Sequence, residues 1–175
     1  MIPATPGPLL IRSATVSDAA AMLAIYAPFV ERTAVSFETA VPNVEEFAAR
    51  VRRYATHWAW LLAERDGHCL GYAYGSPHRE RAAYRWSAET SAYVDPSAQR
   101  QGVGKALYLA LFDALRDRGY CNAYAAMTLP NDASAALHRS VGFDPIGVFR
   151  RVGWKFGTWH DVAWSQCRLR DTPPP

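Results

Sequence analysis

The chain has 175 residues, the length of one domain that can bury a sizeable core. Hydrophobic residues make up 50% and charged residues 20% of it, which excludes a disordered chain, and the net charge of +3 is too small to indicate a nucleic-acid partner. No apolar run approaches the ~20 residues needed to cross a bilayer, so we expect no membrane partner.

The first half of the chain mixes extended and helical patterns. Residues 9–14 predict a short strand, and Thr15 with Asp18 resembles the capping box of a helix start. Apolar residues then recur at helical spacing, and Asn43 is the expected cap of a second helix. Asp66-Gly67 is a hairpin signal. The strands expected in this half cover residues 58–64, 69–75 and 84–94, with a basic loop at 77–83 before the last one.

The second half begins at a glycine-rich stretch, after which helical and extended patterns alternate. Gly119 is the expected C-cap of the third helix. The expected elements are helices over 105–118 and 130–142 and strands over 120–129, 143–151 and 158–169, the last two joined through 153–157. The order β-α-α-β-β-β-α-β-α-β-β predicts an α/β (α+β) fold with a mixed sheet and helices on both faces. We expect one domain over 9–170, with flexible tails at 1–8 and 171–175.

The stretch Gln99-Arg100-Gln101-Gly102-Val103-Gly104 lies between a strand and a helix, a position that suits an anion. The first-turn amides of a helix are unpaired and its dipole adds partial positive charge, while glycine lets a phosphate approach the backbone. A plain strand-to-helix turn explains the same glycines. The pattern is neither a Walker loop nor the dinucleotide fingerprint, since residue 107 is leucine.

Two motifs resemble those of the GNAT superfamily of N-acetyltransferases. The first is Gln99-x-x-Gly102-x-Gly104 before an amphipathic helix, and the second is segment 131–143, which begins with Asn and ends in Gly-Phe. Further segments narrow the resemblance to the phosphinothricin and methionine sulfoximine N-acetyltransferases: 35–39, 86–94, 129–132 and 153–162. The resemblance spans residues 9–170 and implies the GNAT fold, with a mixed, mostly antiparallel central sheet flanked by helices.

The resemblance implies acetyl-CoA as the cosubstrate and no metal ion. The diphosphate would lie on the amides of the glycine turn, and the pantetheine arm would run beside the end of the central strand. Asn131 would bond the arm, although a plain helix cap accounts for it too. The implied cofactor-binding residues are Ala92, Tyr93, Val94, Arg100, Gln101, Gly102, Val103, Gly104, Lys105, Asn131 and Ser134.

Glu89 and His138 are the candidates for proton transfer. Strand alternation puts Glu89 on one face with Ser91 and Tyr93 in an otherwise uncharged strand, and burying a charge there is costly unless it serves a purpose. The matching Glu of the resembling family is the proposed general base; a structural ion pair is the alternative. His138 stands where many superfamily members have a Tyr proposed to protonate the leaving thiolate. It can donate a proton or only pack against the cofactor.

The acceptor pocket is expected around the basic loop. Arg79 and Arg81 can hold a carboxylate or phosphinate through paired hydrogen bonds, although a solvated charged loop is the common alternative. Tyr84 and Phe37 are expected to wall this pocket. Lys155, in a segment that in relatives helps build a dimer interface near the active site, completes the expected substrate-binding set.

The predicted function is acetyl-CoA-dependent N-acetylation of the α-amine of a small amino-acid analogue, by direct transfer. The alternatives are another amine acceptor (an amino acid, a polyamine or a peptide N-terminus) and a non-catalytic acetyl-CoA-binding module. The resemblance implies a homodimer. The three scattered cysteines lack metal-ligand spacing and the N-terminus lacks signal-peptide order, so reduced thiols and a cytoplasmic location are expected.

Overall fold

A computed structural model describes residues 6–172, and a seven-stranded sheet forms the centre of this part of the chain. The strand order is β1-β2-β3-β4-β5-β7-β6, and every neighbouring pair is antiparallel except β4 with β5. The strands are β1 (Leu10–Ser13), β2 (Trp60–Arg65), β3 (His68–Pro77), β4 (Ser87–Val94), β5 (Asn122–Thr128), β6 (Asp144–Lys155) and β7 (Thr158–Arg168). The predicted mixed, mostly antiparallel sheet is confirmed.

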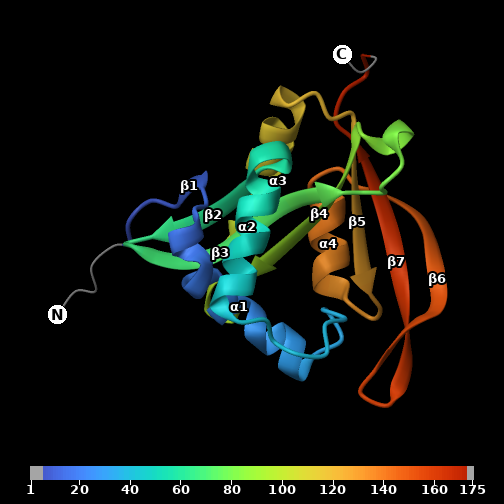
Figure 1. Cartoon of the computed structure of the whole chain (residues 1–175), viewed down its shortest axis with the longest axis horizontal. Helices are drawn as coiled ribbons and strands as arrows, with labels where there is room; N and C mark the ends of the chain where they lie inside the picture. The colour runs from blue at the N-terminus through green and yellow to red at the C-terminus, as the bar shows by residue number, and fades with distance from the viewer. Residues whose placement is uncertain (1–5, 173–175) are drawn as a thin grey trace.

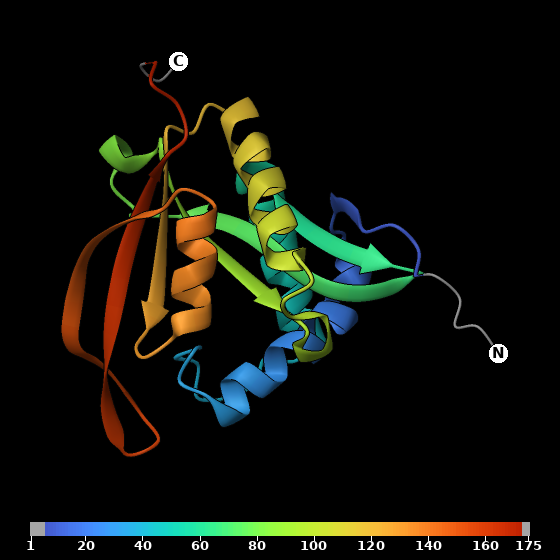
Figure 2. The same cartoon turned by 180° about the vertical axis from the view of Figure 1, so that it is seen from behind.

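Helices cover both faces of the sheet. The first pair, α1 (Ala19–Arg32) and α2 (Val44–Trp58), lies in front of β2 to β4 (Figure 1). The second pair, α3 (Val103–Asp117) and α4 (Asp132–Ser140), covers the opposite face (Figure 2). Short 3-10 turns precede α1, β4 and α3: η1 (Val16–Asp18), η2 (Ala82–Tyr84) and η3 (Pro96–Ala98). The predicted order of elements and the covering of both faces are confirmed.

Each pair of helices closes its own apolar core against the sheet. Leu107, Leu111 and Leu115 of α3 are fully buried and pack in one cluster with small sheet residues such as Ala88. The second cluster fills the α1/α2 side and includes Met22, Phe47, Val51, Trp60 and Tyr72. Because successive side chains of a strand point to opposite faces, Ala88 faces α3 and its neighbour Glu89 faces the other side.

The strand predicted to begin at Tyr84 begins three residues later, at Ser87. Residues 82–84 form a 3-10 turn instead, in which the Tyr84 amide donates to the Arg81 carbonyl at 2.9 Å. The basic loop therefore ends in this turn, and β4 starts only after it.

The segment 153–157, predicted as a loose connection, is mostly strand. β6 runs to Lys155, and Phe156-Gly157 forms a two-residue turn in which both residues have positive φ, the backbone that such tight hairpins require. The β6–β7 hairpin therefore extends beyond the end of β5 as an arm (Figure 1).

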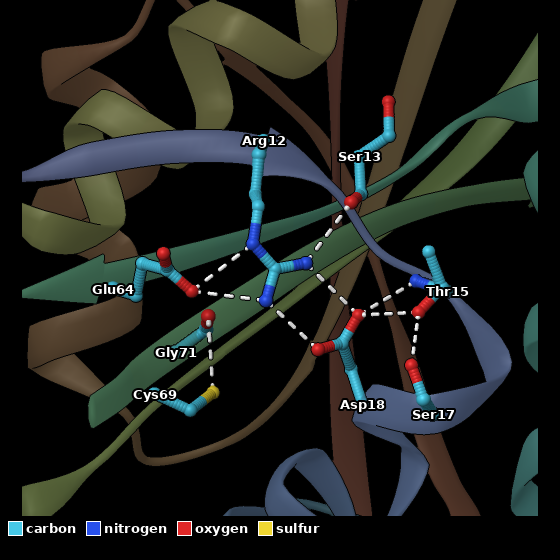
Figure 3. Close-up of polar contacts among 8 residues, drawn as sticks. All are labelled: Arg12, Ser13, Thr15, Ser17, Asp18, Glu64, Cys69 and Gly71. Atoms are coloured by element: carbon cyan, nitrogen blue, oxygen red, sulfur yellow. Dashed lines mark hydrogen bonds and ion pairs between the residues drawn. The ribbon is translucent and has the colours of Figure 1, made fainter. Parts of the chain in front are cut away.

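Arg12 joins the N-terminal strand to the first turn (Figure 3). Its guanidinium donates two hydrogen bonds to Asp18, at 2.8 and 2.9 Å, and one to Glu64 of β2, at 3.0 Å. Asp18 also accepts the Thr15 amide at 2.8 Å, so the carboxylate half of the predicted capping box forms. Hydrogen bonds from Arg12 and Thr15 hold the pKa of Asp18 well below its usual value.

The start of the described chain contacts the turn between β2 and β3. The Gly7 amide donates to the Asp66 carboxylate at 3.2 Å, next to the β2–β3 turn. Residues 1–5 and 173–175, which belong to the predicted tails, lie outside the described residues. Among residues 6–172, no helix has both the length and the apolar character needed to cross a membrane.

Candidate active site

The sheet opens between β4 and β5 just beyond Glu89. These strands pair in parallel only from Ser87 to Glu89, opposite residues 122–124, and then diverge, as both views show (Figures 1 and 2). β4 continues to pair with β3 as far as Val94. Within the described chain, the β5-facing backbone groups of residues 91–94 therefore have no strand partner. Since buried backbone groups need partners, this opening suits a ligand that carries amides of its own.

The predicted pantetheine-binding residues border this opening through their backbone. The Tyr93 ring lies on the α1/α2 side of the sheet, where it packs edge-on against Tyr26 of α1 with ring centroids 4.9 Å apart. At the apex, the Thr90 hydroxyl donates to the Tyr124 carbonyl at 3.1 Å. The Thr90 side chain thus closes the apex, and the unpaired backbone groups of β4 begin immediately beyond it.

The glycine turn supplies a helix start with free amides. Gly102 is the N-cap of α3 with φ +81°, and the first helical bond runs from the Ala106 amide to the Gly102 carbonyl. A Cβ on Gly102 would meet nothing within 4 Å, so the positive φ explains this glycine. A Cβ on Gly104 would lie 3.0 Å from Leu137, so the second glycine lets α4 approach α3. The amides of the first turn are available to an anion.

The other predicted residues of the turn differ in what they offer. Arg100 and Lys105 are exposed at its rim, where their charges are available to a phosphate. The Gln101 side chain turns away, because it donates to the Ser97 carbonyl and accepts from Arg65 at 3.0 Å. Only the backbone of Gln101 therefore faces the proposed anion.

Asn131 caps α4 by accepting the Ser134 amide at 3.0 Å. This contact is the plain helix cap that the sequence left open as an alternative. It uses the side-chain oxygen of Asn131. Both residues lie at the start of α4, the helix whose Leu137 touches the glycine turn.

Glu89 is half-buried on the face turned away from α3 and α4. Its side chain is 32% exposed, and burial raises its pKa while the charge of Arg79 lowers it in part. Its cross-strand neighbours are Ser76 on β3 and Tyr124 on β5. Among the described residues no Lys or Arg nitrogen lies within 4 Å of this carboxylate, so the structural ion pair considered from the sequence does not form.

Aromatic rings pack around His78, the residue of the basic loop that lies next to Glu89. The His78 ring lies parallel to Tyr124, with centroids 4.3 Å apart, and meets Tyr84 and Trp164 edge-on near 6 Å. The Arg79 guanidinium lies 5.6 Å from the centre of the Trp164 ring. The structure thus brings Arg79 and Tyr84 to this group, as predicted for the acceptor side, while Arg81 is exposed at the start of η2. His78 and Trp164 were missed because they lie 86 positions apart in the sequence.

His138 is buried, with only 5% of its surface exposed. Its Nε2 atom lies 3.1 Å from the Tyr108 hydroxyl, and its ring packs on Phe143 with centroids 5.0 Å apart. Burial lowers the pKa of His138 to about 4, so the ring is neutral at neutral pH. The role of His138 as the acid stays a prediction, and in that role the neutral imidazole would have to donate the proton.

An open, polar cavity of about 410 Å³ lies between α2 and β3. It is lined by Glu38, Glu46, Ala49, Arg50, Arg53, Tyr54, Tyr74 and Ser76. Ser76 is the cross-strand neighbour of Glu89, so the cavity is on the same face as the carboxylate. Arg50 is paired with Glu38, whereas Arg53 has no acidic group within 4 Å among the described residues. No local pattern in the sequence indicated this cavity, since three separate segments build it.

Phe37 and Lys155 hold the loop between α1 and α2. The Phe37 ring lies against the backbone of Gly153 and 6.2 Å from the His160 ring. Lys155 is only 5% exposed, and its ammonium donates to the Val30 and Ser36 carbonyls, each at 2.7 Å. The predicted substrate-binding role of Lys155 does not fit this burial. The residue instead fixes the loop that carries Phe37.

The described chain shows neither a metal cluster nor a disulfide. Among residues 6–172, no group of three His, Cys, Asp or Glu side chains is placed to hold a metal ion. The cysteines at positions 69, 121 and 167 are unpaired.

Known proteins match the chain over most of its length. The acetyltransferase (GNAT) domain family matches residues 11–164. A phosphinothricin N-acetyltransferase from Streptomyces viridochromogenes is 36% identical over 168 residues, which cover 96% of this chain and 92% of that protein. An L-methionine sulfoximine/L-methionine sulfone acetyltransferase from Salmonella typhimurium is 32% identical over 168 residues, covering 95% and 98%.

A solved structure agrees in fold and carries the cosubstrate. The GNAT superfamily phosphinothricin acetyltransferase from Sinorhizobium meliloti, in complex with AcCoA, has a TM-score of 0.91 at 31% identity and covers 95% of this chain and 93% of its own. The opening beside β4 and the free amides of the glycine turn fit a ligand with amides and a diphosphate. The chain therefore belongs to the GNAT acetyltransferase family and is an acetyl-CoA-dependent N-acetyltransferase.

Proposed function

We propose that this N-acetyltransferase acts on the α-amine of a small amino-acid analogue with a second acidic or polar group, by direct transfer. The observation that carries the proposal is the position of Glu89. It is a half-buried carboxylate at the apex of the opening that suits the pantetheine arm, and no Lys or Arg of the described chain neutralises it. Relatives named for phosphinothricin and for methionine sulfoximine support this acceptor class.

Glu89 is proposed as the general base. Acetyl-CoA supplies the acetyl group as a thioester, and the acceptor ammonium must lose a proton before its nitrogen can attack. Glu89 takes that proton directly or through a water molecule. Because burial raises the pKa of Glu89, its ionised form is a stronger base than an exposed carboxylate, and the charge of Arg79 helps it to stay ionised.

The basic loop is proposed to hold the second group of the acceptor. Arg79 and Arg81 have no acidic side chain within 4 Å among the described residues. One terminal nitrogen of Arg79 donates to the His78 carbonyl at 2.8 Å, and its remaining donors and the Arg81 guanidinium are available to an anion. The Arg79 guanidinium lies over the Trp164 ring, and Tyr84 meets the neighbouring His78 ring edge-on. A carboxylate or phosphinate accepts two parallel hydrogen bonds from such a guanidinium. A polyamine acceptor would prefer acids at this place.

Glu89→Gln tests the proposed base. The substitution keeps the size of the side chain and removes its basicity, so turnover should fall by roughly 10²–10⁴-fold. We would follow thiol release from acetyl-CoA with methionine sulfoximine as acceptor, and measure acetyl-CoA affinity by calorimetry, which should stay unchanged. Glu80→Gln, an exposed acid of the neighbouring loop, is the matched control and should keep full turnover.

Two outcomes would contradict the proposal. Unchanged turnover in Glu89→Gln would remove Glu89 as the base. A panel of amines, including polyamines and ordinary amino acids, decides the acceptor class. Turnover of polyamines alone would replace the proposed acceptor, and acetyl-CoA binding without thiol release for any amine would favour the non-catalytic module.

We also propose a homodimer that forms through the β6–β7 hairpin. Large apolar side chains are exposed there in one continuous segment: Ile146, Val148, Phe149, Val152, Trp154, Phe156 and Trp159. Contiguous apolar surface of this kind is typical of a protein interface. A cytoplasmic location is proposed as well, supported by the unpaired cysteines and by a cosubstrate that is made inside cells.

A further inference from the structure

His78 stands next to the proposed base and has an unmet hydrogen bond. Its side chain is 12% exposed, and its Nδ1 atom is buried without a hydrogen-bond partner in the described chain. A buried polar atom without a hydrogen-bond partner either costs folding free energy or serves a function. The polar atom placed to meet it is Oε2 of Glu89, 3.9 Å away.

The surrounding elements fix the plane of the His78 ring. Tyr124 of β5 stacks on one face of it at 4.3 Å and 14°, and the rings of Tyr84 and Trp164 meet it edge-on. The residue directly follows β3, in which Ser76 is paired with Glu89. The ring therefore has little freedom to rotate away, and a shift of the carboxylate by about 1 Å would bring the two atoms to hydrogen-bond distance. Hydrogen bonds of resting active sites often tighten in this way when substrate binds.

We propose that His78 is a positioning residue for Glu89, donating its Nδ1 proton to the carboxylate so that one oxygen is fixed and the other faces the acceptor amine. The inference rests on the proposed function, since it assigns a partner to the proposed base. Nothing in the sequence singled out this histidine, which occurs in the basic loop among charged residues.

The charges around the pair support a neutral imidazole facing an ionised carboxylate. The titratable side chains next to the pair are Arg79 on the same loop, Tyr84 on η2 and Tyr124 on β5, the two tyrosines through ring contacts with His78. Burial and the charge of Arg79 both lower the pKa of His78, so the ring is neutral at neutral pH. A neutral donor stabilises the carboxylate without cancelling its charge. Removal of that donor should make Glu89 harder to ionise.

The test compares His78→Phe with His78→Asn. Phenylalanine keeps the stacking on Tyr124 and removes the donor, whereas asparagine restores an amide donor near the position of Nδ1. The pKa of Glu89 would be measured by carbon NMR on glutamate-labelled protein, with the resonance assigned by its loss in Glu89→Gln. We expect His78→Phe to raise that pKa by about one unit and His78→Asn to return it toward wild type. His68→Phe, an exposed histidine at the start of β3, should change nothing.

Kinetics give the second measurement. The acid limb of the pH profile of kcat/KM should move up with the Glu89 pKa in His78→Phe. Because the carboxylate also loses its fixed orientation, kcat should fall by about tenfold even where Glu89 is ionised, and the KM for acetyl-CoA should stay unchanged. In a Glu89→Gln background the same substitution should have no further effect on kcat. A thermal melt checks folding, and His78→Ala replaces His78→Phe if the latter does not fold.

An unchanged or lowered Glu89 pKa in folded His78→Phe would overturn the proposal, as would an equal loss of kcat in the Glu89→Gln background. The NMR measurement needs no acceptor, so it separates the two ideas. If the pKa shifts while Glu89→Gln retains full turnover, the hydrogen bond exists and Glu89 is not the base.

Discussion

Burial acts in opposite directions on the two residues predicted to move protons. It raises the pKa of Glu89 and lowers that of His138 to about 4, because in each case it disfavours the charged form. At neutral pH the His138 ring is therefore neutral and cannot act as an imidazolium acid. Any donation to a leaving thiolate has to come from the N–H of the neutral ring, or through Tyr108, whose hydroxyl lies 3.1 Å from it.

The burial of His138 predicts how stability depends on pH. An unfolded chain protonates this ring below about pH 6.5, whereas the folded chain resists protonation until about pH 4. The unfolded state thus binds more protons between these values, and stability falls as the pH drops from 6.5 to 4, by up to about 3 kcal/mol. Denaturation of wild type and His138→Leu across this range should show that the variant lacks this part of the pH dependence. A His138 pKa near 6.5 by NMR would contradict it.

The two arginines of the basic loop predict a change in acceptor affinity. Arg79→Ala or Arg81→Ala should raise the KM for an acceptor with an acidic head, such as phosphinothricin, by roughly 10-fold or more, because a paired charged hydrogen bond is lost. The KM for methionine sulfone, whose head is neutral, should change less. Arg52→Ala, an exposed arginine on α2, is the control. If both loop variants keep the KM of wild type, the anion is bound elsewhere, and Arg53 beside the α2 cavity is the next candidate.

Sequence reasoning found some site residues and missed others for a physical reason. Glu89 was found because a charge inside an apolar strand costs free energy that must have an explanation. His78 looked like one more polar residue of a solvated loop, since the stacking on Tyr124 depends on a parallel pairing that no local pattern reveals. Lys155 was assigned to the substrate because it lies in a segment that resembles the part of relatives near the active site, but its ammonium is buried on two carbonyls.

At the scale of elements, local chemistry predicted starts and ends better than it predicted pairings. Asn43 caps α2 by accepting the Glu46 amide at 2.9 Å, as the sequence indicated. The divergence of β4 and β5 has no such local signal, because it depends on which residues of two distant segments stop pairing. The hairpin turn at 156–157 was placed only approximately for the same reason: Gly153 and Gly157 punctuate the segment, yet only the second lies in the turn.

The joint between β1 and η1 predicts a measurable loss of stability. Asp18→Asn should destabilise the fold by about 1 kcal/mol at pH 7, since it weakens the paired hydrogen bonds from Arg12 at a partly exposed site. The pKa of Asp18 is depressed, so its contribution is complete above about pH 4 and is lost as the pH falls through the folded value. Urea denaturation should therefore show a smaller difference between wild type and Asp18→Asn at pH 2.5 than at pH 7, because pH 2.5 lies below the unfolded pKa but not below the folded one.

Asp171→Asn is the matched control for that experiment. Asp171 pairs with Arg168, but their side chains are 91% and 74% exposed, so solvent screens the interaction. The control should behave as wild type at both pH values. An equal loss for Asp18→Asn and Asp171→Asn, or a loss at pH 2.5 as large as the loss at pH 7, would show that Arg12 does not act through the charge of Asp18.

At the scale of the whole molecule, the sheet divides the work between its faces and its edges. The α3/α4 face carries the glycine turn and the buried His138, the opposite face carries Glu89, and the opening between β4 and β5 joins them. One edge of the sheet, β6, carries large apolar side chains that no described segment covers. From the sequence alone these residues were expected only as strands, and the link of the segment around Lys155 to a dimer interface came from the family resemblance, because periodicity reports apolar side chains and not whether their cover belongs to the same chain.

That uncovered edge predicts a dimer that a single charge can disrupt. Trp154 and Phe156 are 58% and 59% exposed, and Trp154 packs edge-on against Trp159 across the hairpin, with centroids 5.3 Å apart. Burying such rings against a second copy would remove a large apolar area from water, whereas a carboxylate there would remain unpaired. Sedimentation should give a dimer mass for wild type and a monomer for Phe156→Asp. Leu109→Asp, a similarly exposed leucine on α3, should stay dimeric. A monomeric wild type, or dissociation by both variants alike, would mean that the hairpin is not the interface.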